Sequence, residues 1–338
     1  MKLFIKYWLL FLIPFFFLLI CYIVFDPFKV IWPYDNYYVK GDGGINRDYV
    51  STTTYIKQKD TYHYDSFIFG NSRSLFFKID DWKKYINPNS MCYHYSESGG
   101  SVIGLLKKLE LIDKYNEKIN NAIIALDYDL LHQTEGKERL FSTAPQLLSY
   151  RNFFRFHLEH LQAWFDFNFL KYWTYYHVFN IETPKMAKYI EKGNNYDYYN
   201  PITNEEPFTE EDILMNKGLF YDESRMNYFK NIQHPDSIFP IAINDERKKI
   251  LTQAKDILIK HNTIYKIIIN PLYNQIKINP QDYNCLCEIF GKDNVFDFTG
   301  INKWTSDYHN YYEPSHYIPR VALEIMDSIY KKPNNTFH

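Results

Sequence analysis

Two distant segments of this 338-residue chain carry residues that can act together as an activated nucleophile. Residues 65–74 run from an apolar, aromatic-rich stretch into Gly70-Asn71-Ser72-Arg73, and a helix-compatible segment follows. A buried strand that ends in this way delivers a serine to the carboxyl edge of a parallel sheet, where open α/β sheets place their sites. Near the other end of the chain, Glu313-Pro314-Ser315-His316 sets an acid three residues before a histidine. Serine, acid and histidine are the parts of a nucleophilic triad, so the two segments together indicate an enzyme.

Each of these residues also has an ordinary structural interpretation. Ser72 can serve only as a helix N-cap after a strand, and Glu313 can begin a capped helix with Pro314 near its first position. A lone histidine such as His316 is commonly packed in a core. Asp307 and His309 form a rival acid–histidine pair just upstream. The joint order and spacing of serine, acid and histidine favour the catalytic interpretation.

The elements that position these residues alternate between strands and helices. Strands are expected at Ser66–Phe69, Met91–Tyr95, Ala122–Leu126, Tyr265–Ile269 and Val295–Phe298. Helices are expected at Leu75–Ile86, Val102–Tyr115, Ala242–His261, Asp282–Phe290 and Tyr317–Tyr330. Apolar runs within the third and fourth strands read as buried on both faces. The pattern therefore predicts a flavodoxin-like, three-layer α/β fold with a parallel sheet of about five strands.

Two segments fall outside this alternation. Residues 26–64 are polar and punctuated by glycine and aspartate, which is typical of a linker or an irregular lead-in. Residues 132–240 are rich in aromatic residues, with helix-like runs such as 144–169. An insertion of this size most often forms a cap over the substrate site, the alternative being a loosely ordered excursion. The domain expected over residues 65–338 thus carries a mostly helical insertion.

The N-terminal segment is strongly apolar. Tyr7 to Phe25 is a run of 19 residues without a charge, and as a helix it would span about 28 Å, enough to cross a hydrocarbon core. Lys2 and Lys6 precede the run, so the positive-inside rule places the N-terminus in the cytoplasm and the remainder outside it. A cleaved signal peptide is the competing interpretation, but no small-residue cleavage site follows the run. Lipidation at Cys21 is disfavoured by the bulky Ile20. We expect residues 1–25 to be an uncleaved transmembrane anchor.

The amino-acid composition further narrows the class of protein and the partners that it could bind. A net charge of −2 and a pI near 6.6 give no indication of nucleic acid or anionic lipid as a partner. The aromatic content of 19% is typical of AT-rich coding, with a carbohydrate-stacking surface as the functional alternative. The four cysteines have neither the spacing of a disulfide framework nor that of a zinc site. No metal, disulfide or cofactor is expected.

With these residues in view, the chain resembles the SGNH (GDSL-type) hydrolase superfamily, in particular its membrane-anchored bacterial branch linked to acylation and deacylation of cell-surface glycans. Gly70-Asn71-Ser72-Arg73 is similar to the first block of that family, with Asn71 where many members carry aspartate. Ser98-Gly99-Gly100-Ser101 resembles the second block, whose glycine donates a backbone N–H. Glu313-Pro314-Ser315-His316 resembles the last. The resemblance covers roughly residues 65–131 and 241–331. The elbow motif of α/β-hydrolases is absent after Ser72.

The chain departs from the family pattern at two positions. Asp127 stands where the family has the asparagine of its third block, and a carboxylate cannot donate to an oxyanion unless it is protonated. The resemblance then leaves an oxyanion hole of the Ser72 and Gly99 or Gly100 backbone N–H groups beside Asp127. Glu313 replaces the usual aspartate, and it is expected to reach His316 across one turn because residues three apart share a helix face. Asn71 and Arg73 are candidate substrate-binding residues, although a salt bridge accounts equally well for Arg73.

The resemblance implies an extracytoplasmic serine esterase or O-acyltransferase that acts on a cell-surface polysaccharide through an acyl-enzyme on Ser72. Hydrolysis and transfer share that intermediate, so the sequence leaves the choice open. Transfer would need a partner, a membrane-embedded acyltransferase that exports the acyl group. The alternatives from other classes are an inert, membrane-anchored scaffold in envelope glycan assembly and a plain sugar-binding module.

Overall fold

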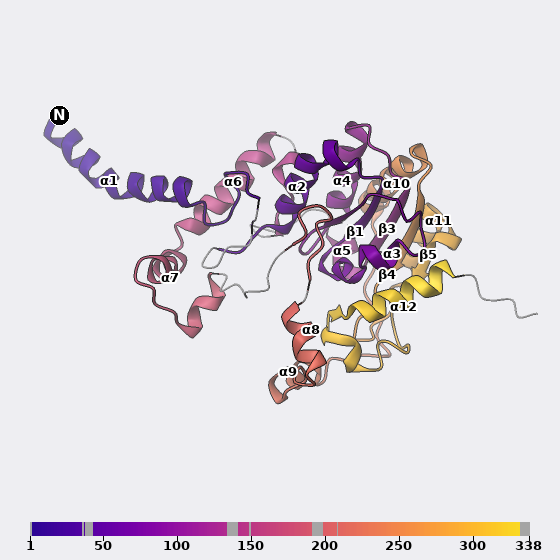
Figure 1. Ribbon diagram of the computed structural model, residues 1–338. Helices are drawn as coiled ribbons and strands as arrows, with labels where there is room; N and C mark the ends of the chain where they lie inside the picture. The colour runs from indigo at the N-terminus through magenta and orange to yellow at the C-terminus, as the bar shows by residue number, and fades with distance from the viewer. Residues whose placement is uncertain are drawn as a thin grey trace, which may run out of the picture.

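A computed structural model describes residues 2–35, 37, 43–133, 141–148, 150–190, 199–207 and 209–331. Its centre is a parallel sheet in the order β2-β1-β3-β4-β5, the order of flavodoxin-like doubly wound folds (Figure 1). The strands are β1 Ser66–Gly70, β2 Cys92–Ser96, β3 Asn121–Leu126, β4 Ile264–Ile269 and β5 Val295–Asp297. Each of the five predicted strands is confirmed to within one residue at either end. Near-continuous burial along β1 and β3 explains their apolar runs.

Helices cover both faces of the sheet. One face packs against α2 (Arg47–Tyr62), α4 (Val102–Lys114), α10 (Asp245–Lys260) and α11 (Pro280–Phe290). The opposite face packs against η1 (Ser72–Phe76), α3 (Ile79–Trp82), the hairpin β6 (Tyr311–Glu313) with β7 (His316–Tyr317), and α12 (Pro319–Tyr330). The chain also forms the short elements α5 (Tyr128–His132), η5 (Lys292–Asn294) and η6 (Tyr308–Asn310). The three-layer α/β fold is as predicted.

The helices predicted over Ala242–His261 and Asp282–Phe290 are α10 and α11, with starts shifted by three and two residues, and two other predicted helices differ from the structure for a clear reason. The helix expected over Leu75–Ile86 is instead two short pieces, η1 and α3, because Phe77 between them adopts an extended backbone. Phe76 and Phe77 are fully buried there, so tertiary packing overrides the local helical pattern. The helix expected from Tyr317 begins at Pro319, because Tyr317 belongs to the strand β7.

The predicted linker over 26–64 contains a helix that belongs to the domain. In α2, Asn46 is the N-cap and accepts a hydrogen bond from the Tyr49 N–H at 2.8 Å. Tyr55 is fully buried among the aromatic residues of β1 and β2. Its neighbour Ser51 donates to the Ser96 carbonyl at 2.8 Å. The threonine-rich sequence has low helix propensity, so these contacts with the sheet, rather than local preference, stabilise α2.

The insertion is largely helical, as expected. The run 144–169 is divided into η3 (Pro145–Leu147), α6 (Tyr150–Trp164) and the start of α7 (Phe167–His177), because Asp166 interrupts it as the N-cap of α7. η4 (Pro184–Lys188), α8 (Thr209–Asn216) and α9 (Glu223–Phe229) follow. In Figure 1, α6 and α7 lie beside the N-terminal helix α1 (Lys2–Phe25), and α8 and α9 form a separate lobe near α12.

The N-terminal helix α1 packs on the insertion. The Trp164 indole N–H donates to the Leu18 carbonyl at 2.9 Å, and Phe15 stacks on Phe165 with 5.2 Å between ring centroids. Within the part of the chain that the structure describes, no helix meets the length and apolarity needed to cross a membrane.

Candidate active site

Ser72 stands at the carboxyl end of β1, as the sequence predicted, and is the first residue of η1. Gly70 permits this sharp turn, because a side chain there would meet the Ala125 carbonyl and the Ser74 side chain at 2.8 Å. Asn71 is the N-cap of η1, and its side-chain oxygen accepts from the Arg73 N–H at 3.1 Å. Strand, glycine and cap together hold the Ser72 hydroxyl at the sheet edge.

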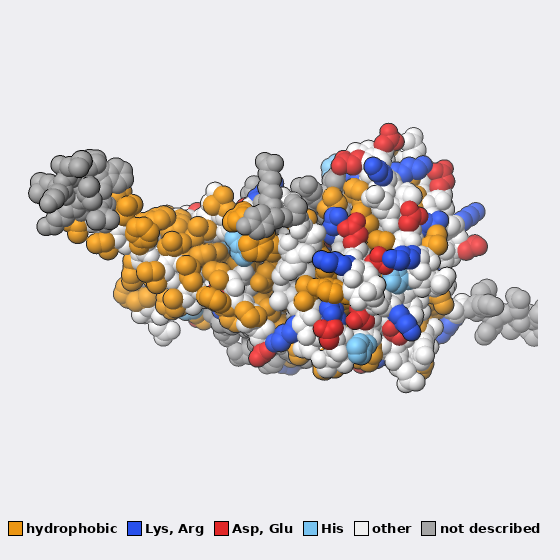
Figure 2. All heavy atoms as spheres, turned by 90° about the horizontal axis from the view of Figure 1, so that it is seen from above, with side chains coloured by type: hydrophobic (Ala, Val, Ile, Leu, Met, Phe, Trp, Pro, Cys, Tyr) orange, Lys and Arg blue, Asp and Glu red, His pale blue; other side chains and the backbone are white. Residues whose placement is uncertain are grey.

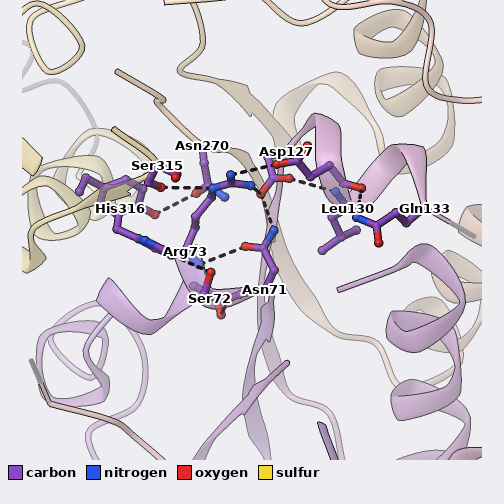
Figure 3. A network of polar contacts seen from close by, with 12 residues as sticks. Asn71, Ser72, Arg73, Asp127, Leu130, Gln133, Asn270, Ser315 and His316 are labelled. Atoms are coloured by element: carbon purple, nitrogen blue, oxygen red, sulfur yellow. Dashed lines mark hydrogen bonds and ion pairs between the residues drawn. The ribbon is translucent and has the colours of Figure 1, made fainter. Parts of the chain in front are cut away.

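Ser72 and His316 form a hydrogen-bonded pair. The Ser72 Oγ lies 2.7 Å from His316 Nε2, which is within the range of a nucleophile and its base (Figure 3). His316 Nδ1 contacts the Glu313 carboxylate. Because a carboxylate only accepts, the Nδ1 proton is assigned to this contact, which leaves Nε2 as the acceptor of the Ser72 proton. The structure thus brings together the three residues of the predicted triad.

Glu313 reaches His316 across a hairpin and not across a helical turn, which corrects the local geometry expected from their spacing. Glu313 ends β6, His316 begins β7, and the two are paired in the antiparallel register. The second oxygen of Glu313 accepts from the Ser315 N–H at 3.0 Å. Burial would raise the pKa of Glu313, but the hydrogen bond and charge of His316, with the Ser315 contacts, hold the pKa below its ordinary value. Glu313 is therefore a carboxylate at neutral pH.

The rival pair lies apart from the serine. His309 Nδ1 contacts Asp307 at 2.7 Å, and both side chains are about half exposed. Asp307 also caps η6 by accepting from the His309 N–H. This pair has a local structural role, and it is His316 that reaches Ser72.

Asp127, which the resemblance placed in the oxyanion hole, is instead part of a buried ion pair. Its Oδ2 lies 2.8 Å from Arg73 Nη1 and accepts from the Asn71 amide at 2.7 Å. Its Oδ1 caps α5 by accepting from the Leu130 N–H at 3.0 Å. Burial alone would raise the pKa of Asp127, but the charge of Arg73 and these hydrogen bonds outweigh it and hold the pKa below its ordinary value. A charged, fully engaged carboxylate is not available as a donor to an oxyanion.

Asn71 and Arg73, the candidate substrate-binding residues, are turned toward the protein. Arg73 also contacts Asp129 at 3.0 Å. Its Nε donates to the Ser315 carbonyl at 3.2 Å, as Figure 3 shows. Burial would lower the pKa of Arg73, but the two carboxylates raise it. The guanidinium therefore links the end of β1, the end of β3 and the loop that carries His316, which is a positioning role.

Gly99 and Gly100 follow β2 in left-handed backbone conformations, with φ of 77° and 50°. A side chain at Gly100 would meet Asn71 Cβ at 3.1 Å, so this loop lies against the residue before Ser72. Ser72 is the first residue of η1. Because the first N–H groups of a helix have no acceptor within that helix, the Ser72 N–H makes no hydrogen bond inside η1. The Ser72 N–H and the glycine loop stay the predicted source of oxyanion donors.

A cavity of about 540 Å³ opens beside the triad. It is lined by Tyr312, Glu313 and His316 together with residues of the insertion, Glu211, Asp222, Ser224, Arg225 and Tyr228. The volume lies within the usual range for small-ligand sites. Acidic, arginine and tyrosine side chains are hydrogen-bonding partners suited to hydroxyl groups. The position of α8 and α9 at this cavity is what a cap over the site requires.

Sequence reasoning missed two buried residues around the site. His94 on β2 contacts the Ser74 carbonyl at 2.7 Å and so ties η1 to the sheet; burial lowers its pKa to about 3, so it is neutral. Asn270, directly after β4, accepts from the Tyr317 hydroxyl at 2.9 Å. A polar residue at the end of a buried strand is the signal that could have identified Asn270. Nothing in the local sequence distinguishes His94.

No protein-family model matches this chain, and no curated protein shows significant similarity to it. Among the described residues, no group of histidine, cysteine and acidic side chains is arranged to hold a metal ion.

Proposed function

We propose that this protein is a serine esterase or O-acyltransferase that acts on a cell-surface polysaccharide outside the cytoplasm. The observation that carries the proposal is the contact of 2.7 Å between Ser72 Oγ and His316 Nε2, with Glu313 on the opposite ring nitrogen. Serine is a weak nucleophile at its free pKa, and an adjacent, oriented base is what activates it. The resemblance to SGNH hydrolases supports the assignment of the reaction.

The chemistry follows from this arrangement. His316 Nε2 accepts the hydroxyl proton while Ser72 Oγ attacks the carbonyl carbon of an ester. The tetrahedral intermediate collapses, the C–O bond to the leaving alcohol breaks, and His316 returns the proton to that alcohol. The acyl-enzyme is then attacked by water or by a sugar hydroxyl, with His316 again as the base. The ester bond to Ser72 Oγ breaks, and His316 returns the proton to that oxygen. Glu313, ionised at neutral pH, stabilises the imidazolium in both steps.

The carbonyl oxygen becomes an oxyanion that must be stabilised by donors aimed at it. We assign this role to the backbone N–H of Ser72 and to the Gly99–Gly100 loop, since Asp127 is committed to Arg73. Two backbone donors can form an oxyanion hole without an asparagine, so this departure from the family pattern is compatible with activity.

The cavity beside His316 is the proposed substrate site. Its polar lining supports a sugar, and Tyr228, which is 62% exposed, offers a ring on which a sugar can lie. Hydrolysis and transfer differ in whether water reaches the acyl-enzyme, which α8 and α9 would control. A transferase would receive its acyl group from a membrane-embedded partner.

The location is proposed from the sequence. Residues 7–25 would anchor the chain in the inner membrane, with the lysines that precede them in the cytoplasm and the catalytic domain outside it.

A fluorophosphonate probe tests the proposal, because it reacts only with an activated serine. We expect the full-length protein to be labelled and Ser72→Ala to lose the label. Ser306→Ala, which changes an exposed serine away from the triad, should be labelled like the native protein. An unlabelled native protein that also lacks ester hydrolysis would favour the alternative function, an inert scaffold in envelope glycan assembly.

A further inference from the structure

The exposed apolar side chains of this protein are concentrated at one end. They lie on α1, on α6, and from the start of α7 to just beyond its end, whereas charged side chains spread over the opposite end (Figure 2). The surface of α6 and α7, taken with the residues that directly follow α7, includes Phe153, Leu158, Phe167, Val178, Phe179 and Ile181. Large exposed apolar surfaces mark sites of contact with a protein or a membrane.

This surface is continuous with α1. Phe15 of α1 stacks on Phe165, which lies between α6 and α7. The ring centroids of Phe25 and of Trp173 on α7 are 5.1 Å apart. The three helices also share a buried aromatic cluster that includes Tyr22, Trp164 and Trp173. Whatever medium surrounds α1 therefore also reaches the outer face of α6 and α7.

The distribution of apolar residues on α1 identifies that medium. Exposed Tyr7, Phe11, Phe16, Phe17 and Ile23 project in different directions around the helix axis, because successive residues of a helix are rotated by about 100°. A helix that is apolar on nearly every side needs an apolar environment all round, whereas a protein partner would cover one face. Lipid meets this requirement.

The polar groups of α6 and α7 agree with a place at the surface of a bilayer. Arg155 and Glu159 pair with each other at 2.8 Å along α6, so their charges are compensated within the helix. The Lys171 ammonium lies 5.4 Å from the Tyr172 ring and 5.6 Å from the Tyr175 ring. Lysine beside tyrosine and tryptophan is typical of the membrane interface, where the charge reaches water and the rings reach the acyl boundary.

We propose that α6 and α7 form a second membrane contact, in which their aromatic face lies in the interface of the bilayer beside α1. This inference rests on the proposed membrane location. The two halves of the insertion then have different roles. Helices α6 and α7 hold the domain against the lipid, whereas α8 and α9 line the cavity at His316.

Site-specific photocrosslinking in full-length protein tests this contact. Benzoylphenylalanine replaces Leu158, Phe167 or Phe179 in protein reconstituted in phosphatidylcholine vesicles. Ile259 on α10 is the matched control, because Leu158 and Ile259 are both 53% exposed. Phe16 on α1 reports separately on the anchor. We expect several-fold more lipid adduct at the α6 and α7 positions than at Ile259, and lipid adduct at Phe16.

The outcomes separate the two proposals. Lipid adduct at Phe16 with none at the α6 and α7 positions would overturn the second contact and leave the anchor standing. Adduct at the α6 and α7 positions with none at Phe16 would support the second contact and overturn the anchor. Equal lipid adduct at Ile259, or adduct only to protein, would also overturn the second contact.

Discussion

Among single residues, Glu313 stands where the SGNH pattern has an aspartate, and this difference can be tested. Its carboxylate is one methylene longer than aspartate, and its side chain is 40% exposed. It meets His316 within a two-residue hairpin turn whose Ser315 N–H and hydroxyl both donate to it. The hairpin and these two donors fix the longer side chain where a flexible glutamate would otherwise move.

We expect Glu313→Gln to keep the fold and to lose most of the turnover, because the amide cannot stabilise the imidazolium. The equivalent Asp→Asn change in serine proteases costs about 10⁴-fold in kcat, and less is expected here because Glu313 is partly in water. Ester hydrolysis by the purified full-length variants measures this. Asp307→Asn is the control and should change little. If Asp307→Asn proved as damaging as Ser72→Ala while Glu313→Gln was silent, Asp307 would be the acid.

A second prediction for a single residue concerns Asp127, because the SGNH pattern and the structure predict opposite effects of replacing it with asparagine. Asp127→Asn introduces the asparagine of the SGNH pattern, which by that pattern should improve the oxyanion hole. In this structure it removes the buried partner of Arg73, and breaking such a pair costs roughly 3–5 kcal/mol of unfolding free energy. We expect a clear loss of stability in denaturant unfolding. Asp129→Asn, at a carboxylate that is 55% exposed, should cost at most about 1 kcal/mol. Equal, small effects of both changes would contradict the positioning role of Arg73.

At the scale of elements, a buried charge cluster joins α2, α4 and the loop after β2. Lys108 Nζ lies 2.9 Å from both Asp48 and Glu97, and all three side chains are buried. Glu97 also accepts from the Ser101 N–H at 3.0 Å, next to Gly100. One ammonium cannot neutralise two buried carboxylates. Burial first, and then the charge of Asp48, raise the pKa of Glu97 to about 7 against the opposing effect of Lys108.

The raised pKa predicts the pH dependence of stability. Unfolded Glu97 ionises near pH 4.5 and folded Glu97 near 7. Between these values the folded state binds more protons, so the free energy of unfolding should fall as the pH rises through this window. Glu97→Gln should flatten that fall, as measured by denaturant titrations at pH 5 and pH 8. A steep fall that persists in Glu97→Gln would assign it to another group.

For the whole molecule, the proposed membrane anchor predicts which compartment the site faces. We expect alkaline phosphatase fused after His338 to be active, and a fluorescent protein that folds only in the cytoplasm to be dark at the same position. Replacing Lys2 and Lys6 with glutamate should weaken this orientation, because the positive-inside rule acts through these charges. The opposite pattern in the native chain, with only the cytoplasmic reporter active, would overturn the proposed location.

The order of residue types along the chain was enough to predict the sheet and the three residues of the triad. Strands buried on both faces leave continuous apolar runs in the sequence, and Ser72 follows such a run. Glu313 and His316 stand in one motif of four residues. Local patterns were therefore sufficient to predict these features. The role of Asp127, the helix α2 and the hairpin of Glu313 became visible in the fold alone. The first two depend on partners distant in the sequence, Arg73 for Asp127 and the buried tyrosines of β2 for α2, and such long-range contacts leave no periodic trace in the chain. The hairpin is a local pairing of β6 with β7, but a spacing of three residues between Glu313 and His316 fits a helical turn equally well, so the spacing did not distinguish the two.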